Sequence, residues 1–436
     1  MHDVLDPRDL VPDEAEQLTH SGYGAGILLE EARSASAAGD LAQLSRIEAS
    51  LSHLVRDPRW TYDEPDDDES LGSIVKRLPR LAVDPTQLEG RIRGAWLGRT
   101  VGNTLGKPVE GLTRREVETY LRAVGQWPQM SFVPLLADLP EGVSHLHESA
   151  SFSAAGTFTD VPRDDDIDWT ILGLHMLETY GRELTTEQIA ASWLDRLPFT
   201  QTFTAERAAY RNLIGGLKVG ETATHRNPYR EWIGALIRAD IFGYTNPGNP
   251  AEAARLALVD ARLSHVANGI YGEIWAAALV ASAMATSSSR KALESALKSV
   301  PENSRLAESL RGVFASYDSG MSAHEALDQV EIRVGHYNWV HTIHNAAHIA
   351  IGLLWGSDFT DTLAITISAG LDTDSAAATV GSVFGALHGS ESIPQHLIGT
   401  THHRVRSAVR DFDRITIDEL VTRTMKLATE VDHDYS

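Results

Sequence analysis

The chain has 436 residues, of which 42% are hydrophobic and 22% are charged, an ordinary globular composition that excludes a disordered or fibrous protein. Acidic residues outnumber basic ones by 60 to 38, and the formal net charge of −22 argues against nucleic-acid binding and against an anionic membrane surface. The absence of cysteine excludes disulfides, thiolate nucleophiles and iron–sulfur clusters, and it fits a cytoplasmic protein. No apolar run reaches 18 residues, so no transmembrane helix is predicted.

Residues 1–85 are predicted to form a small helical extension that ends in an acidic linker. Leu41, Leu44, Ile47 and Leu51 recur at steps of three and four, which is typical of short amphipathic helices. The acidic run 63–69 contains a proline and is expected to be a solvated linker. It lacks the glycine that a calcium-binding EF-hand loop requires, so a calcium site is not expected there.

Residues 86–430 have a different pattern and are predicted to form one large all-α domain. Long apolar stretches at helical period alternate with glycine-bearing loops, for example at 169–177, 274–284, 346–354 and 362–367. Alternating strand patterns are scarce. The predicted fold class is therefore all-α, with helices packed around a single extended core.

Two helical segments carry a glycine at every fourth position. They contain Gly94, Gly98, Gly102 and Gly106 in the first segment and Gly381, Gly385 and Gly389 in the second. Positions four apart share one helix face, so such a stripe predicts close packing of another backbone. A second interpretation is that the loops beside these helices approach a ligand.

The most acidic segment, Asp164-Asp165-Asp166-Ile167-Asp168, leads directly into an apolar helix. A helix N-terminus tolerates negative charge, so a solvated acidic cap is one interpretation. The apolar residues that follow place the cluster against a core, where grouped carboxylates either take up protons or bind a cation. We expect the second outcome.

A second polar segment, Asp372-Thr373-Asp374-Ser375, follows the glycine turn at Gly370. One of its residues is expected to cap the next helix, but a cap uses only one side chain. Two carboxylates and two hydroxyls offer the hard oxygen ligands that Mg²⁺ accepts. The segment is therefore a second candidate metal site.

Three further segments are ambiguous from the residues alone. Glu110 lies in a loop bounded by proline and glycine, where a lone glutamate is expected to be exposed. His341 and His344 share a helix face but lack a third zinc ligand, so we expect them to form hydrogen bonds in a pocket. The segment 260–269 is typical of a polar helix end with satisfied hydrogen bonds. Residues 102–107 mimic a phosphate loop one residue too short, so nucleotide triphosphate binding is not predicted.

Taken in order, Glu110 after a glycine-rich helix, the acidic helix start near 165 and Asp372-x-Asp374-Ser375 resemble the ADP-ribosylglycohydrolase family. This family includes the dinitrogenase-reductase-activating glycohydrolases. The resemblance covers residues 88–390, is most specific from Asp358 to Gly385, and leaves the N-terminal extension outside. It implies a compact orthogonal helical domain that removes ADP-ribose from protein side chains or related acceptors.

The resemblance also implies a metal centre with two Mg²⁺ or Mn²⁺ ions. By position, the implied metal ligands are Asp164, Asp165, Asp166, Asp372, Asp374 and Ser375. The implied catalytic residues are Glu110, Asp165 and Asp166. Asp164 stands where the family motif has threonine, Ile167 stands at its second threonine, and Asn103 replaces a common aspartate, so this is a divergent branch.

The expected substrate is a small or protein-linked ADP-ribose compound whose ribose diol is held by the metal ions. The residues expected to contact it are Asp168, His265, Asn268, Gly269, His341, Asn345, Gly370 and Thr373. Two alternatives stay open. In the first, the substrate is another ribosyl N- or O-glycoside. In the second, the chain is a non-catalytic structural member of the family.

Overall fold

The structure, a computed structural model, describes residues 5–430. In this part of the chain helices dominate, and the named strands are β1 (Arg404–Val405) and β2 (Ile415–Thr416), which pair antiparallel. The predicted all-α class is thereby confirmed. No helix of the described residues is both long and apolar enough to span a bilayer.

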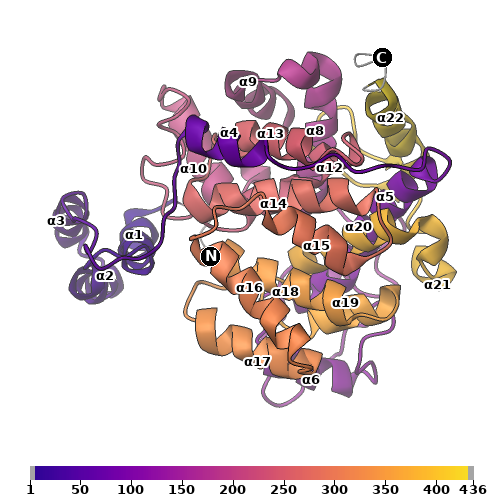
Figure 1. Cartoon of the computed structure of the whole chain (residues 1–436). Coiled ribbons are helices and arrows are strands. Elements are labelled where there is room, and N and C mark those ends of the chain that lie inside the picture. Colours follow the sequence, from indigo (N-terminus) through magenta and orange to yellow (C-terminus); the bar gives the residue numbers. More distant parts are fainter. Residues whose placement is uncertain (1–4, 431–436) are drawn as a thin grey trace.

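Three helices of the N-terminal extension form a small unit beside the body. They are α1 (Pro7–His20), α2 (Gly26–Ala38) and α3 (Leu41–Leu51), and they lie together at one side of the molecule (Figure 1). Asp6 and Asp40 cap α1 and α3 by accepting backbone N–H groups. Leu44, Ile47 and Leu51 point into a core of their own, as their spacing predicts.

The remaining elements build the body around one large apolar core. Its helices are α4 (Asp68–Val75), α5 (Leu88–Gly106), α6 (Arg114–Ala123), α7 (Ala150–Ser153), α8 (Asp165–Tyr180), α9 (Thr186–Arg196), α10 (Thr204–Ile214), α11 (Gly234–Arg238), α12 (Asp240–Tyr244), α13 (Pro250–Ala261), α14 (Ala267–Ala283), α15 (Ser289–Leu297), α16 (Arg305–Asp318), α17 (Ala323–Val334), α18 (Thr342–Trp355), α19 (Phe359–Ile367), α20 (Thr373–His388), α21 (Gln395–Ile398) and α22 (Ile417–Glu430), with short 3-10 turns η1 (Lys107–Val109), η2 (Gly181–Glu183), η3 (Phe199–Gln201) and η4 (Ser390–Ser392).

Helices α5 and α20 pack antiparallel with their backbones in contact. A Cβ added at Gly98 would overlap the carbonyl of Gly381, and one added at Gly106 would overlap the carbonyl of Thr373. The same holds in reverse, because a Cβ at Gly381 would meet the carbonyl of Gly98. The glycine stripes therefore serve tight helix packing, and they bring the C-terminal end of α5 against the N-terminal end of α20.

The acidic linker is not solvated throughout: the sequence-based expectation is wrong at Glu64, whose side chain is 1% exposed, whereas Asp66 is exposed as expected. Glu64 is buried and forms a bidentate ion pair with Arg305, at 2.9 Å from Nε and from Nη2. Asp66 accepts a hydrogen bond from the backbone of Ala267, 2.5 Å away. These interactions attach the linker to the body. The local sequence pattern does not reveal them, because the partners of the two carboxylates lie far away in the chain.

Candidate metal and substrate site

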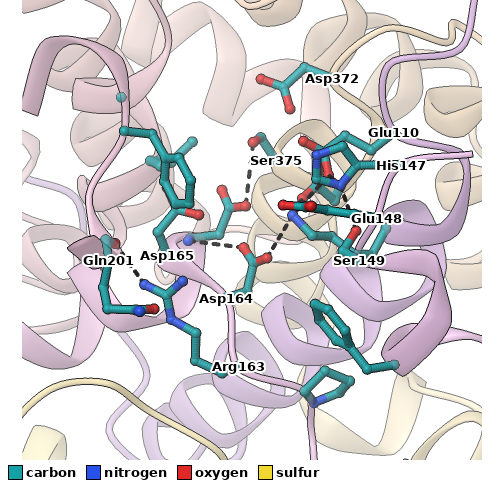
Figure 2. A pocket seen from close by; sticks show the side chains of 18 of the residues that line it. Glu110, His147, Glu148, Ser149, Arg163, Asp164, Asp165, Gln201, Asp372 and Ser375 are labelled. Atoms are coloured by element: carbon teal, nitrogen blue, oxygen red, sulfur yellow. Dashed lines mark hydrogen bonds and ion pairs between the residues drawn. The ribbon is translucent and has the colours of Figure 1, made fainter. Parts of the chain in front are cut away.

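Three segments that carry acidic residues meet at one wall of a cavity of about 1030 Å³ (Figure 2). They are the turn after α5, the N-terminal end of α8 and the N-terminal end of α20. The residues that these three segments contribute to the cavity lining include Glu110, Asp164, Asp165, Asp166, Asp372, Asp374 and Ser375. The structure thus brings together every residue that the sequence assigned to metal binding or catalysis.

The start of α8 fixes the orientation of two carboxylates. Asp164 is the N-cap residue, and its Oδ1 accepts the backbone N–H of Asp166 at 3.1 Å. Asn103, on α5, donates from its amide to Asp164 at 3.0 Å and to Asp166 at 3.2 Å. An aspartate at position 103 would repel both carboxylates, so asparagine suits this more acidic branch.

The start of α20 leaves the Asp372 carboxylate without a capping hydrogen bond. Gly370 and Leu371 both have positive φ and turn the chain sharply before the helix. Asp372 occupies the N-cap position, yet its side chain makes no capping hydrogen bond. Capping alone therefore does not explain this residue.

Lys107 places an ammonium group inside the cluster. Its Nζ lies 2.7 Å from Asp164, 2.7 Å from Asp374 and 2.9 Å from Glu110. Burial opposes the charge, but the surrounding carboxylates outweigh it and raise the pKa of Lys107 well above its usual value. The lysine stays protonated and offsets part of the negative charge.

Several carboxyl groups of the cluster hold their protons more tightly than usual. Burial, reinforced by neighbouring carboxylates, raises the pKa of Glu110 to about 8 and that of Asp165 to about 7. Burial also raises the pKa of Asp166 and of Asp372 well above the ordinary value. Asp164 differs, because Lys107 overcomes its burial and lowers its pKa. Such perturbed groups gathered at one cavity wall indicate a functional site.

The oxygen atoms of the cluster suit a hard divalent cation. Asp166 Oδ1, Asp372 Oδ2 and Asp374 Oδ1 are buried and have no hydrogen-bond partner. Two groups, Glu110–Asp372–Asp374 and Asp164–Asp166–Asp374, each have ligand oxygens within 4.8 Å of one another. Asp374 belongs to both. Orphaned buried carboxylate oxygens are costly unless a cation satisfies them, so the donor set fits Mg²⁺ or Mn²⁺.

Asp168 is turned away from the cavity. It is fully buried and accepts three hydrogen bonds, from Arg163 Nε at 2.7 Å, from Ser407 Oγ at 2.6 Å and from the backbone N–H of Ala408 at 3.0 Å. All of these interactions are structural. The role in substrate contact that its position suggested gains no support from the structure.

The other residues expected to contact substrate do not line the cavity either. His265 lies in a buried network with Ser264 and Arg238, whose guanidinium also binds Glu206 and Asp260. The polar groups of the segment 260–269 are therefore mostly engaged, but His265 Nε2 is buried without a hydrogen-bond partner.

Asn268 and His341 belong to a second buried network, centred on Glu231. Asn268 donates to Glu231 at 3.0 Å and to Glu64 at 2.8 Å, and His341 Nε2 lies 3.9 Å from Glu231. Glu231 also accepts from Gln17 at 2.6 Å, which ties helix α1 to the body. This network holds the extension in place, and the amide of Asn268 is already engaged in it, whereas His341 Nε2 has no hydrogen-bond partner.

The last four predicted contacts have backbone roles. Asn345 donates to the carbonyls of Trp339 and His341 at 3.0 Å, and Thr373 donates to the carbonyl of Gly106 at 2.8 Å. Gly269 and Gly370 pack against neighbouring backbone where a Cβ has no room. As substrate contacts, these residues stay a prediction that no interaction in the structure supports.

Two residues of the site were not found from the sequence. The sequence places Lys107 in a segment that only mimics a phosphate loop. Its position near Glu110, in a chain rich in acidic residues, is the signal that could have indicated a role in the site. His147 comes from the long irregular segment between α6 and α8, and its Nδ1 lies 3.1 Å from Glu110. Nothing in its local sequence distinguishes it.

Comparison with known proteins agrees with this geometry. Residues 84–432 match the sequence profile of the ADP-ribosylglycohydrolase family. A relative from Archaeoglobus fulgidus, described as an uncharacterised protein, is 24% identical over 303 residues, which cover 69% of this chain and 88% of the relative. A solved structure described as an ADP-ribosylglycohydrolase-related protein complex shares 19% identity, covers 79% of this chain and 98% of its own, and has a TM-score of 0.45. The family match spans most of the sequence and includes all three acidic segments, and the chain is therefore a hydrolase of the ADP-ribosylglycohydrolase family.

Proposed function

We propose that this protein hydrolyses the ribosyl glycosidic bond of an ADP-ribosylated substrate, with Mg²⁺ or Mn²⁺ bound by its carboxylate cluster. The observation that carries the proposal is the convergence of seven oxygen-bearing side chains on one wall of the cavity, four of them with a buried oxygen that has no hydrogen-bond partner. A divalent cation held there would orient the hydroxyls of a ribose and stabilise charge near the bond that breaks.

The residues proposed as ligands are Asp164, Asp165, Asp166, Asp372, Asp374 and Ser375. Asn103 and the N-terminal turn of α8 orient two of them, while the Ser375 hydroxyl donates to Asp166 at 3.4 Å. Cleavage of a ribosyl bond passes through a positively charged, oxocarbenium-like state. A wall of carboxylates favours that charge electrostatically.

Glu110 and Asp165 are the proposed proton-transfer groups. Without a metal ion, burial raises the pKa of Glu110 to about 8 and that of Asp165 to about 7, so both groups hold protons near neutral pH. A cation bound beside them would favour their charged form, which accepts protons. Glu110 faces His147, whose half-exposed ring connects it to the cavity. We therefore propose that Glu110 or Asp165 accepts the proton of the attacking water.

Other residues of the cavity lining suit the rest of an ADP-ribose molecule. Phe152 and Phe199 line it and are 47% and 39% exposed, so their rings are available for stacking on a base. Arg163 and Arg406 also line the cavity, and although Arg163 pairs with Asp168 and Arg406 with Asp413, we propose that they contribute positive charge towards a diphosphate. The volume of about 1030 Å³ is at the upper end for small-molecule sites and accommodates an extended dinucleotide-like ligand.

Hydrolysis assays test the proposal directly. The full-length protein, first freed of metal by chelation, is incubated with ADP-ribosylated arginine, ADP-ribosylated serine and simple nucleosides, with and without added Mg²⁺ or Mn²⁺. Release of ADP-ribose that depends on added metal supports the proposal. Hydrolysis of nucleosides alone would move the substrate to another ribosyl glycoside, and no hydrolysis of any of these compounds would favour the non-catalytic alternative.

The lack of cysteine suits a reducing compartment. We also propose a cytoplasmic location, which fractionation of the source cells tests.

A further inference from the structure

Helix α1 of the N-terminal extension turns one face toward the body. Leu10, Glu14 and Gln17 follow one another at steps of four and three residues, so their side chains lie on the same side of the helix. All three interact with one short segment of the body, residues 229–231. The position of this segment is therefore tied to the position of α1.

Two of these interactions are polar and are largely shielded from solvent. Glu14 accepts hydrogen bonds from Nη1 and Nη2 of Arg230, at 2.6 and 3.0 Å. Gln17 donates to the buried carboxylate of Glu231 at 2.6 Å. A bidentate ion pair fixes the relative orientation of its two side chains as well as their distance. Residues 230 and 231 consequently have a defined placement on α1.

The next residue of the segment, Trp232, lines the cavity. Leu10, which does not line the cavity, is buried with Trp232 in a small apolar cluster that also contains Ala205 and Tyr229, and Val340 packs against this cluster. The ring centroids of Tyr229 and Trp232 lie 4.6 Å apart. Trp232 itself is only 5% exposed, so its position depends on the residues that pack around it, Leu10 of the extension included.

Two further cavity residues, Trp339 and Val340, are joined to Trp232 through the backbone. Ile233, which also lines the cavity, donates its N–H to the carbonyl of Val340 at 2.8 Å. Trp232 pairs with His341 through an isolated antiparallel β-bridge. We call Trp232, Ile233, Trp339 and Val340 the tryptophan wall of the cavity. A shift of residues 229–231 is passed to all of this wall through these hydrogen bonds.

We infer that helix α1 is part of the substrate site, with Leu10 as a positioning residue that holds the tryptophan wall in place against a planar group of the bound substrate. Indole rings supply a large flat apolar surface for such a group. The inference rests on the proposed function only in taking the cavity as the substrate site. The family profile begins at residue 84, so the selectivity set by α1 comes from outside the part of the chain that the profile covers.

Fluorine NMR of protein labelled with 5-fluorotryptophan tests the inference by binding. The full-length protein is kept in Mg²⁺ and titrated with ADP-ribose, and Trp232→Phe and Trp339→Phe assign the two resonances. We expect ADP-ribose to shift both resonances in the wild type. Leu10→Ala should move the Trp232 resonance before ligand is added and should raise the Kd for ADP-ribose about tenfold, which equals about 1.4 kcal/mol.

A change confined to the tryptophan wall distinguishes positioning from general damage. The affinity for Mg²⁺ should stay at the wild-type value in Leu10→Ala, because the carboxylate cluster is built by the ends of α5, α8 and α20. In an active protein, Leu10→Ala should raise KM for the ADP-ribosylated substrate by the same factor as Kd, with little change in kcat.

Leu29→Ala is the matched control, because Leu29 is buried in the core of the extension itself, a cluster that contains no residue of the body. It should keep the wild-type Trp232 resonance and Kd, and so should Leu10→Met, which restores the apolar volume. A folded Leu10→Ala protein with the wild-type Kd would overturn the inference. Equal weakening by Leu29→Ala, or bound ADP-ribose that moves neither resonance, would overturn it too.

If Leu10→Ala does not fold, Glu14→Gln takes its place and is read by the same criteria, since it removes one charge of the pair with Arg230. Hydrolysis is assayed on the same preparations, so the two proposals fail separately. A wild type that binds ADP-ribose at the tryptophan wall but hydrolyses nothing contradicts the proposed function only. Full activity with equal Kd and KM in Leu10→Ala contradicts the role of Leu10 only, and a wild type that does not bind ADP-ribose contradicts both.

Discussion

Replacing Asp374 by asparagine should abolish the stabilisation of the protein by divalent metal. Asp374 is the one carboxylate that belongs to both candidate ligand groups among the described residues. Asparagine keeps the size of the side chain and removes its charge, so the tight contact between α5 and α20 should persist. The perturbation therefore acts on the metal site and leaves the scaffold in place.

The size of the effect follows from linkage. Metal at one hundred times its dissociation constant stabilises the folded state by about 2.7 kcal/mol. An unfolding entropy of about 2.1 cal/mol/K per residue, taken over 436 residues, gives close to 0.9 kcal/mol/K. The midpoint of the wild type should rise by about 3 °C. A hundredfold loss of affinity in Asp374→Asn would leave about 0.4 kcal/mol, or roughly 0.5 °C.

Differential scanning fluorimetry of chelated and Mg²⁺-loaded protein measures both shifts. Asp411→Asn is the control, because the Asp411 side chain is 74% exposed and its left-handed backbone also accommodates asparagine. The control should retain the wild-type shift. An Asp374→Asn protein that gains about 3 °C at the same Mg²⁺ concentration would refute the assignment of Asp374 as a ligand.

Three other perturbations have defined outcomes. Gly98→Ala should lower the free energy of unfolding in urea by about 1–3 kcal/mol because its Cβ meets the α20 backbone, whereas Gly90→Ala in the same helix, with open space around it, should not lower it. Arg305→Met removes the ion-pair partner of two buried carboxylates, Glu64 and Glu231, and should lower the free energy of unfolding by about 3–5 kcal/mol. It should also speed proteolysis of the linker at 61–67. Unchanged stability would contradict the role of Arg305 in attaching the linker to the body. Burial raises the pKa of Glu206 to about 7 despite Arg238, so the folded state keeps a proton that the unfolded chain releases above its ordinary pKa. Relative to Glu206→Gln, the wild type should lose about 3 kcal/mol of unfolding free energy between pH 4.5 and 7, measured by urea unfolding at each pH; a parallel pH dependence would contradict this.

Much of the site could be predicted from sequence because its residues lie in short acidic runs. Asp164 to Asp166 and Asp372 to Ser375 stand out against the apolar helices that follow them, and the structure places them on the same cavity wall. Glycine at every fourth position likewise predicted the α5–α20 contact, because a helix face without side chains allows another backbone to approach closely.

The rest could not be predicted because it depends on partners distant in the sequence. Asn268 and His341 lie at helix ends and were expected to contact substrate, yet both lie beside Glu231 of the body, and Asn268 also binds Glu64 of the linker. Polar residues buried in such networks have the same local sequence as residues that contact a ligand. Lys107 is the converse case, since its partner Asp374 is 267 positions away.

The antiparallel pairing of α5 with α20 has a consequence for synthesis of the protein. Each ligand group takes residues from segments far apart in the chain, because α20 begins only at Thr373 and follows nearly all of the body. A nascent chain that has emerged only as far as α18 carries the acidic start of α8 without its counterpart. Metal held by these groups therefore cannot guide any folding step that precedes the synthesis of α20.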